Sequence, residues 1–269
     1  MRAEHGFSTL VTVIKDGRRH SLLFDAGLTQ DGLVQNMEIL EVNPSDLRAV
    51  VLSHGHADHA LGLLGMVRRR GRHALPLVLH PEAFRTRKIV LPDGHEIRLP
   101  PPNRADLEAE RVELVEERGP SYLLEQTVLI TGQVPRGTDF EKGFPIHFAE
   151  RDGRWERDPW IHDDQAIVMK VKGKGLIVLT GCGHSGLINI LTQAQALAGG
   201  ERIHAVVGGF HLTGGLFDPI IPRTVEELRR FGPAVVVPGH CTGWKATHAI
   251  AAAMPAAFVQ NSVGTTFIL

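Results

Sequence analysis

The segment SHGHADH, residues 53–59, carries the densest group of metal-ligand residue types in this chain. Imidazole nitrogens bind zinc, iron and nickel, and a carboxylate adds negative charge and accepts harder ions. The group follows the apolar run 49–52, so it is expected at the turn that ends a strand. There the first two histidines converge on one ion, while the aspartate and the third histidine face a neighbouring position. The predicted ligands are His54, His56, Asp58 and His59.

Three later segments share another pattern, in which an apolar strand ends in a glycine-containing turn that presents a histidine. The strands are predicted at 175–180, 203–208 and 234–238. In layered α/β folds ligands bind at the carboxyl ends of strands, because the loops diverge there above a rigid sheet. We therefore expect these histidines to join the first group. His184 and His240 are predicted metal ligands, and His211 is predicted to contact substrate or to complete a coordination sphere.

The H-x-H-x-D-H group resembles the signature of the metallo-β-lactamase superfamily, whose members commonly hold two metal ions over a hydrolytic centre. Further segments are similar, in order along nearly the whole chain, to the subgroup typified by 7,8-dihydropterin-6-methyl-4-(β-D-ribofuranosyl)aminobenzene-5′-phosphate synthase. The most specific of them is GCGHSG at 181–186. The others lie at 4–8, 130–136, 163–166, 208–212 and 238–243.

This resemblance implies the fold class α/β, as a four-layer αββα metallo-β-lactamase-like sandwich in one domain over 1–269. The alternation of strands with helices predicted near 186–198, 221–231 and 244–253 favours sheets covered by helices. A hairpin is predicted at 7–14 and 21–26, helices at 30–41 and 59–70, and closing strands at 257–258 and 265–269. The segment at about 84–120, rich in proline and charge, is expected to be an irregular insertion or cap.

Two positions depart from the superfamily pattern. Cys182 stands where an aspartate usually bridges the two metals; a thiolate ligand and a residue that only shapes the turn are both open. The usual third histidine, expected near 128–131, is absent, and His184 is expected to replace it.

Asp25 resembles the aspartate that orients a ligand histidine by accepting a hydrogen bond.

Several polar residues near these segments are candidates for substrate contact. Arg136 could grip a phosphate through two parallel hydrogen bonds, and Asp164 is predicted to bind substrate with it. For Glu141 and Lys142 the preferred interpretation is surface placement.

Composition limits the partners. The 269 residues carry a formal net charge of −1, which disfavours a nucleic-acid partner, and the basic group at 68–72 is interpreted as a solvated helix end. No apolar run approaches the ~20 residues of a membrane span. A cytoplasmic protein is therefore expected, with a small-molecule substrate and no membrane partner.

Relatives carry a further strand ahead of residues 4–6, so a missing strand is expected to leave a sheet edge exposed or paired in a homodimer.

The predicted function is metal-dependent hydrolysis, in which a metal-activated water attacks an ester, amide or phosphate-type substrate. Asp58 and His211 are the predicted catalytic residues. Two divalent metal ions are expected, zinc first, with iron, manganese and magnesium as alternatives. Two other functions stay open: a synthase-type transferase that joins a pterin diphosphate to an arylamine ribotide, and a non-hydrolytic metal-binding sensor or redox protein.

Overall fold

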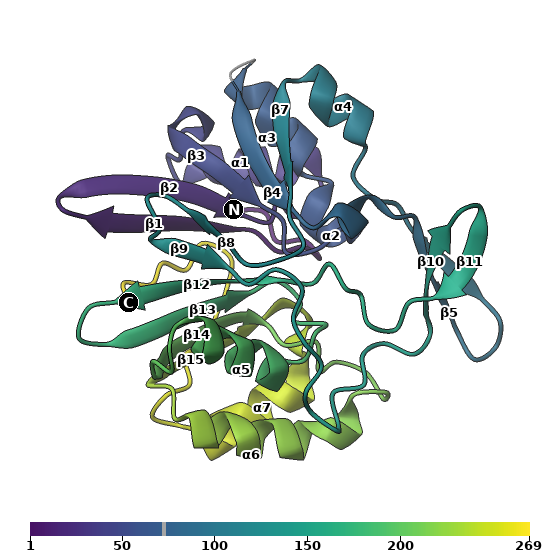
Figure 1. Cartoon of the computed structure of the whole chain (residues 1–269), viewed down its shortest axis with the longest axis vertical. Helices are drawn as coiled ribbons and strands as arrows, with labels where there is room; N and C mark the ends of the chain where they lie inside the picture. The colour runs from purple at the N-terminus through teal and green to yellow at the C-terminus, as the bar shows by residue number, and fades with distance from the viewer. Residues whose placement is uncertain (72–73) are drawn as a thin grey trace. The chain divides into compact units, whose positions relative to one another are not determined.

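The computed structural model describes residues 1–71 and 74–269, which divide into two compact units (Figure 1). Unit 1 comprises Met1–Arg118 and Phe144–Asp163, and unit 2 comprises Gly119–Gly143 and Asp164–Leu269. The expected single domain over 1–269 stays a prediction. Arg72 of the predicted basic group lies outside the described residues. Among the helices of residues 1–71 and 74–269, none has the length and apolar character that crossing a membrane requires.

The larger sheet of unit 1 has the strand order β1-β2-β3-β4-β7. β1 and β2 form the predicted antiparallel hairpin, and Asp16 and Gly17 both adopt the positive φ that its tight turn requires. The remaining neighbours pair in parallel, which explains why β3 and β4 read as apolar runs rather than alternating ones. The strands are β1 (Thr9–Lys15), β2 (Arg18–Phe24), β3 (Leu47–Val51), β4 (Leu75–Leu79) and β7 (Val112–Glu116).

Four α-helices accompany the sheets of unit 1 within the described residues. The single helix predicted over 59–70 is divided in two, and this is a correction. The backbone N–H of Gly62 donates to the carbonyl of Gly27, outside the helix, so the regular helical ladder is interrupted there. The helices are α1 (Gln30–Ile39), α2 (Ala57–Ala60), α3 (Leu63–Arg70) and α4 (Arg104–Ala109).

Unit 1 also holds a small antiparallel sheet with the order β11-β10-β5-β6, which stands beside the larger sheet of the same unit in Figure 1. The expectation of an irregular segment over 84–120 is wrong, because this stretch contributes β5, β6, α4 and β7. Between β6 and α4, residues 100–103 form no regular structure, and the first three of them are prolines without backbone N–H groups. Its role as a cap stays a prediction. The small sheet consists of β5 (Arg87–Val90), β6 (Glu96–Leu99), β10 (His147–Arg151) and β11 (Arg154–Arg157).

Unit 2 is built on one sheet with the order β15-β14-β13-β12-β9-β8. β13, β14 and β15 run parallel, and the other neighbours pair antiparallel. The strands expected at 257–258 and 265–269 are corrected: only a single bridge joins Val236 to Phe258, and 265–269 forms no strand. The strands are β8 (Ser121–Leu123), β9 (Val128–Ile130), β12 (Ala166–Val171), β13 (Gly175–Thr180), β14 (Ile203–Gly209) and β15 (Val235–Gly239).

The helices α5 (Leu187–Leu197), α6 (Ile221–Phe231) and α7 (Trp244–Ala253) follow these parallel strands and lie on one face of the sheet (Figure 1). Their bounds agree with the predicted helices. α6 ends at Gly232, whose φ of 61° provides the left-handed C-cap. Apolar side chains of the sheet and helices form the core of unit 2, and unit 1 has a separate core.

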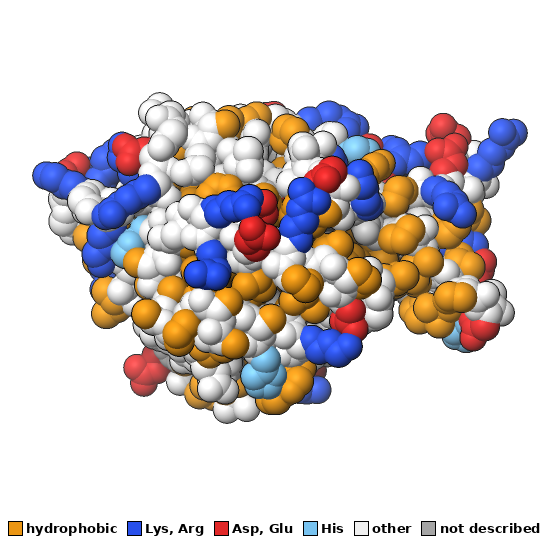
Figure 2. Space-filling view, turned by 90° about the horizontal axis from the view of Figure 1, so that it is seen from below, with side chains coloured by type: hydrophobic (Ala, Val, Ile, Leu, Met, Phe, Trp, Pro, Cys, Tyr) orange, Lys and Arg blue, Asp and Glu red, His pale blue; other side chains and the backbone are white. Residues whose placement is uncertain are grey.

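On the face drawn in Figure 2, basic and acidic side chains are interspersed among apolar ones.

Candidate metal-binding residues

In unit 1, residues 53–59, here called the metal-motif turn, follow β3 in the middle of the larger sheet. A close backbone approach requires the glycine of this turn. A Cβ on Gly55 would lie 1.9 Å from the carbonyl oxygen of Ala83, in the 3-10 turn η2 (Pro81–Phe84). The N–H of Gly55 donates to Oδ2 of Asp163 at 2.8 Å. The turn is thus fixed against two other segments of the same unit.

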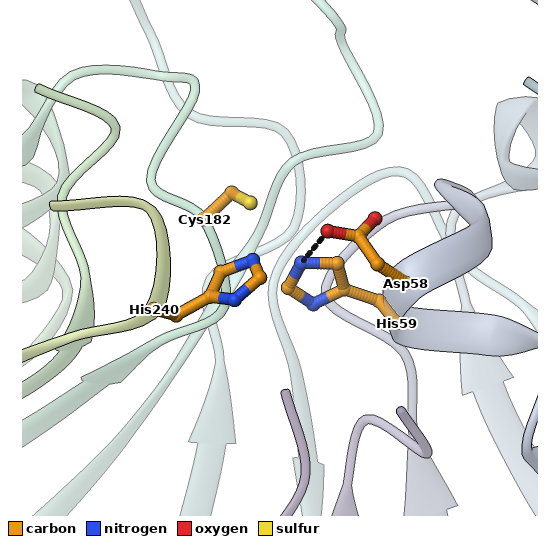
Figure 3. Close-up of side chains that lie close together, drawn as sticks. All are labelled: Asp58, His59, Cys182 and His240. Atoms are coloured by element: carbon orange, nitrogen blue, oxygen red, sulfur yellow. Dashed lines mark ion pairs between the residues drawn. The ribbon is translucent and has the colours of Figure 1, made fainter. Parts of the chain in front are cut away.

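The histidines of the metal-motif turn are buried and packed against one another. The ring centroid of His54 lies 4.5 Å from that of His56 and 4.3 Å from that of His59. Asp58 keeps 20% of its side chain exposed, and its Oδ2 lies 3.8 Å from Nε2 of His59 (Figure 3). The structure therefore brings these predicted ligands together within unit 1.

In His54 and in His59, the Nδ1 atom of the ring makes a hydrogen bond. Nδ1 of His59 lies 2.7 Å from Oδ2 of Asp25, and Nδ1 of His54 lies 2.8 Å from Oγ of Ser53. Asp25 also accepts the N–H of Ser53 at 2.6 Å and its hydroxyl at 2.7 Å. In each ring Nε2 is then the nitrogen that can face a metal. Metal-ligating histidines commonly show this arrangement, in which a hydroxyl or carboxylate holds the other nitrogen, so these residues fit a metal ion.

The charge state of His56 also suits a ligand. Burial, followed by the neighbouring His147 and Arg87, holds the pKa of His56 well below its usual value. A neutral imidazole offers a lone pair to a metal ion, whereas a protonated one would repel it.

In unit 2, the predicted histidine turns follow three neighbouring parallel strands, whose carboxyl ends share one edge of the sheet. His211 and His240 adopt positive φ values of 42° and 48°, which are uncommon for residues with a side chain. The ligand atoms of Cys182, His184 and His211 lie within 4.8 Å of one another. The edge of this sheet therefore gathers a mixed nitrogen and sulfur donor set.

Cys182 also lies beside His240 (Figure 3). The ligand atoms of these two residues lie within 4.8 Å of each other. The second cysteine, Cys241, is buried, and its Sγ donates to the carbonyl of Cys182 at 3.4 Å. Burial would raise the pKa of Cys241, but hydrogen bonds with the Cys182 side chain and with His211 outweigh it and hold that pKa well below its usual range. The two cysteines are thus neighbours that no disulfide joins.

The turn that carries Cys182 and His184 is supported by Asp164. Oδ2 of Asp164 accepts the N–H of Ser185 at 2.8 Å, and its backbone carbonyl accepts the Ser185 hydroxyl at 3.0 Å. Burial raises the pKa of Asp164, while the N–H of Ser185 opposes the shift. The observed contacts of Asp164 hold the turn, and its predicted contact with substrate stays a prediction.

The other polar candidates lie on the segment between β9 and β10. Arg136 is half-buried and donates to the carbonyl of Val134 at 3.0 Å, so its role toward a substrate stays a prediction. Surface placement of Glu141 is wrong: only 5% of the residue is exposed. Its carboxylate accepts the N–H groups of Ile188 and Asn189 at 2.9 and 3.0 Å, which are otherwise unsatisfied at the start of α5.

Sequence reasoning missed two buried polar residues of the small sheet. His147, on β10, is fully buried and lies next to His56. Arg87, on β5, is 1% exposed and pairs with Asp158 and Asp163. Neither stands in a recognisable motif, because each lies on a short strand far along the chain from its partners. Their burial is the signal that identifies them.

The family model described as the metallo-beta-lactamase superfamily matches residues 5–240, and the chain belongs to this superfamily. A relative from Methanocaldococcus jannaschii, 7,8-dihydropterin-6-methyl-4-(beta-D-ribofuranosyl)-aminobenzene-5'-phosphate synthase, is 29% identical over 248 residues, covering 91% of this chain and 83% of the relative. An uncharacterized protein of the same organism is 30% identical over 250 residues, covering 91% of this chain and 86% of its own length.

Among solved structures, the chain is similar to Tm1679, described as a metal-dependent hydrolase of the beta-lactamase superfamily. The TM-score is 0.79 at 28% identity, over 100% of this chain and 93% of that chain. The predicted α/β fold class of the metallo-β-lactamase type is confirmed.

Proposed function

We propose that this chain is a metal-dependent hydrolase of the metallo-β-lactamase fold, acting on an ester, amide or phosphate-type small molecule. One observation carries the proposal: the buried histidines of the metal-motif turn, with the Nδ1 atoms of His54 and His59 held by Ser53 and Asp25. Burial for stability alone would not require neighbouring imidazoles whose Nδ1 atoms are each held by a hydrogen-bonding partner. The similarity to Tm1679, a metal-dependent hydrolase, supports the same reaction class.

We propose two divalent ions, held by the ligands that the sequence predicts. His54, His56 and His184 would hold one ion, and Asp58, His59 and His240 the other, with Cys182 or water between them. Imidazole and thiolate donors favour zinc or iron over magnesium, which prefers oxygen ligands. When bound, such ions activate a water near neutral pH and polarise the group under attack.

The remaining residues have the following proposed roles. Asp58 orients the attacking water and accepts its proton, since its carboxylate is partly exposed beside His59. His211 contacts the substrate, and Arg136 and Asp164 bind it as well. A cytoplasmic location and a homodimer remain predictions.

The alternative is a synthase-type transferase, favoured by the 29% identity to the archaeal synthase. That reaction joins a pterin diphosphate to an arylamine ribotide and releases diphosphate, whereas a hydrolase consumes water.

The experiment uses protein purified without chelator or affinity-tag metal and loaded with zinc or iron. Initial rates are measured on a panel of lactones, phosphodiesters and amides, and diphosphate release is measured with the pterin diphosphate and the arylamine. We expect metal-dependent hydrolysis of a member of the panel and no diphosphate release. Diphosphate release that requires the arylamine would overturn the hydrolase proposal in favour of the transferase.

A further inference from the structure

His147, a buried residue of the small sheet of unit 1, contacts His56 of the metal-motif turn. Nε2 of His147 lies 2.9 Å from Nε2 of His56, and Nδ1 of His147 lies 3.1 Å from the carbonyl oxygen of Asp158. His147 is 0% exposed and His56 is 7% exposed. A direct contact between two ring nitrogens requires that one of them carries a proton and the other a lone pair.

The Asp158 carbonyl decides the direction of this hydrogen bond. A carbonyl oxygen can only accept, so Nδ1 of His147 is the donor there. In a neutral His147 ring, Nε2 is then the acceptor. Beside such a neutral ring, His56 donates from Nε2, which leaves its lone pair on Nδ1. His54 and His59 show the opposite arrangement, since their Nδ1 atoms contact Ser53 and Asp25.

The position of His147 is itself fixed by charged residues of unit 1. Nε of Arg87 lies 3.4 Å from Oδ2 of Asp158, and its Nη1 donates to Oδ2 of Asp163 at 3.1 Å. The same Oδ2 accepts the N–H of Gly55, the residue before His56. The contacts therefore form a closed chain, here called the circuit. It runs from His56 through His147, Asp158, Arg87 and Asp163 to Gly55. Arg87, Asp158 and Asp163 are each at most 2% exposed, so little water competes for these bonds.

We propose that His147 is a positioning residue, which accepts the Nε2–H of His56 and thereby fixes His56 as a ligand through Nδ1. The proposal rests on the metal centre assigned above. His147 acts through His56 and does not touch the ion. A role in stability alone would make His147 a hydrogen-bonded core residue whose loss weakens folding but leaves the ring of His56 and the metal affinity unchanged.

The first test reads the tautomer of His56 directly. In nitrogen-15-labelled, metal-free protein, long-range nitrogen–proton correlation spectra report which ring nitrogen carries the proton. We expect a proton on Nε2 of His56 and on Nδ1 of His147. The spectrum of the His147→Ala variant identifies the His147 resonances by their loss. A proton on Nδ1 of His56 would overturn the proposal.

The second test measures zinc affinity by competition with a chromophoric chelator. We expect His147→Ala to weaken zinc binding about 10–100-fold, as loss of an outer partner does at other metal sites. His147→Gln should recover much of this loss, because its side-chain carbonyl can still accept from His56. The matched control is Phe148→Ala on the same strand, whose side chain points to the other face. It removes packing from β10 without touching the circuit and should leave the affinity unchanged.

The outcomes separate this proposal from the proposed function. Zinc binding by the wild type with equal affinity in His147→Ala overturns the positioning role alone. Equal losses in His147→Ala and Phe148→Ala also overturn it, because they would reflect loosening of the sheet. A wild type that binds no metal overturns the hydrolase proposal and the positioning role together.

Discussion

Asp25 and His59 form a fully buried pair, in which the carboxylate Oδ2 lies 2.7 Å from Nδ1 of the imidazole. The same carboxylate accepts the backbone and side chain of Ser53, so one residue at the end of β2 fixes both ends of the metal-motif turn. Asp25 adopts a φ of 61°, a conformation that aspartate and asparagine tolerate better than most residues. The pair therefore links the fold of the sheet to the orientation of a predicted ligand.

Asp25→Asn tests this link, since asparagine keeps the size and tolerates the backbone conformation. The amide has one oxygen and an NH2 group that cannot accept, so it loses either the Ser53 N–H or the contacts of Oδ2 with His59 and the Ser53 hydroxyl. We expect zinc affinity to fall about 10–100-fold, measured by chelator competition. Asp16→Asn, at an exposed turn with a φ of 49°, is the matched control. Equal affinities in both variants would show that Asp25 does not orient His59 for a metal.

Gly55→Ala probes the close approach of the metal-motif turn to Ala83. A Cβ would lie 1.9 Å from a backbone oxygen, so one of the two segments must shift. We expect a loss of about 1–3 kcal/mol in the free energy of unfolding, measured by urea denaturation, with weakened metal binding. Gly119→Ala, where a Cβ meets nothing within 4 Å, should change neither. An unfolding midpoint that stays at the wild-type value in Gly55→Ala would contradict the packing described here.

Arg87→Met removes the cation from a buried group of carboxylates. Asp158 and Asp163 would then each lose a buried cationic partner, because Arg87 pairs with both. Breaking a buried pair in this way costs about 3–5 kcal/mol, and chemical denaturation should detect it. Arg98→Met, on the exposed side of the same sheet, should have little effect. Similar stabilities of the two variants would mean that the Arg87 pairs contribute nothing to folding.

Glu141 should make stability depend on pH. Burial raises the pKa of this carboxyl, although the N–H groups of Ile188 and Asn189 oppose the shift. The folded protein therefore holds the proton more tightly than the unfolded chain. The contribution of Glu141 is greatest at low pH and decreases as pH rises from the ordinary glutamate pKa through the raised one, by at most about 1.4 kcal/mol per pH unit.

Glu141→Gln removes this titration while keeping an acceptor for α5. Urea denaturation of both proteins at several pH values should show the stability of the wild type falling relative to the variant as pH rises through that window. A stability difference that stays constant with pH would show that the Glu141 carboxyl does not titrate differently in the folded state.

The local patterns of the sequence predicted much of this structure. Glycine turns after apolar strands placed His184, His211 and His240 at the edge of one sheet, because parallel strands end together. The helices at 221–231 and 244–253 follow from apolar periodicity between clear end signals, such as Gly232. In such segments the information lies within a few residues of the element itself.

The missed features depend on contacts between segments distant in sequence. Glu141 reads as a surface residue until α5 supplies N–H groups for its carboxylate. His147 and Arg87 stand on short strands, where polar residues usually face solvent, and only tertiary packing buries them. The division of the helix predicted over 59–70 likewise depends on Gly62, whose partner Gly27 belongs to the segment after β2.

The metal content of the purified protein tests the central claim most directly. Native mass spectrometry of wild type, His56→Ala and His240→Ala, prepared without chelator or affinity-tag metal, counts the bound ions per folded chain. We predict two divalent ions in the wild type and a reduced number in each variant. No bound ion in the wild type, or two ions retained in both variants, would contradict the metal centre proposed for this protein.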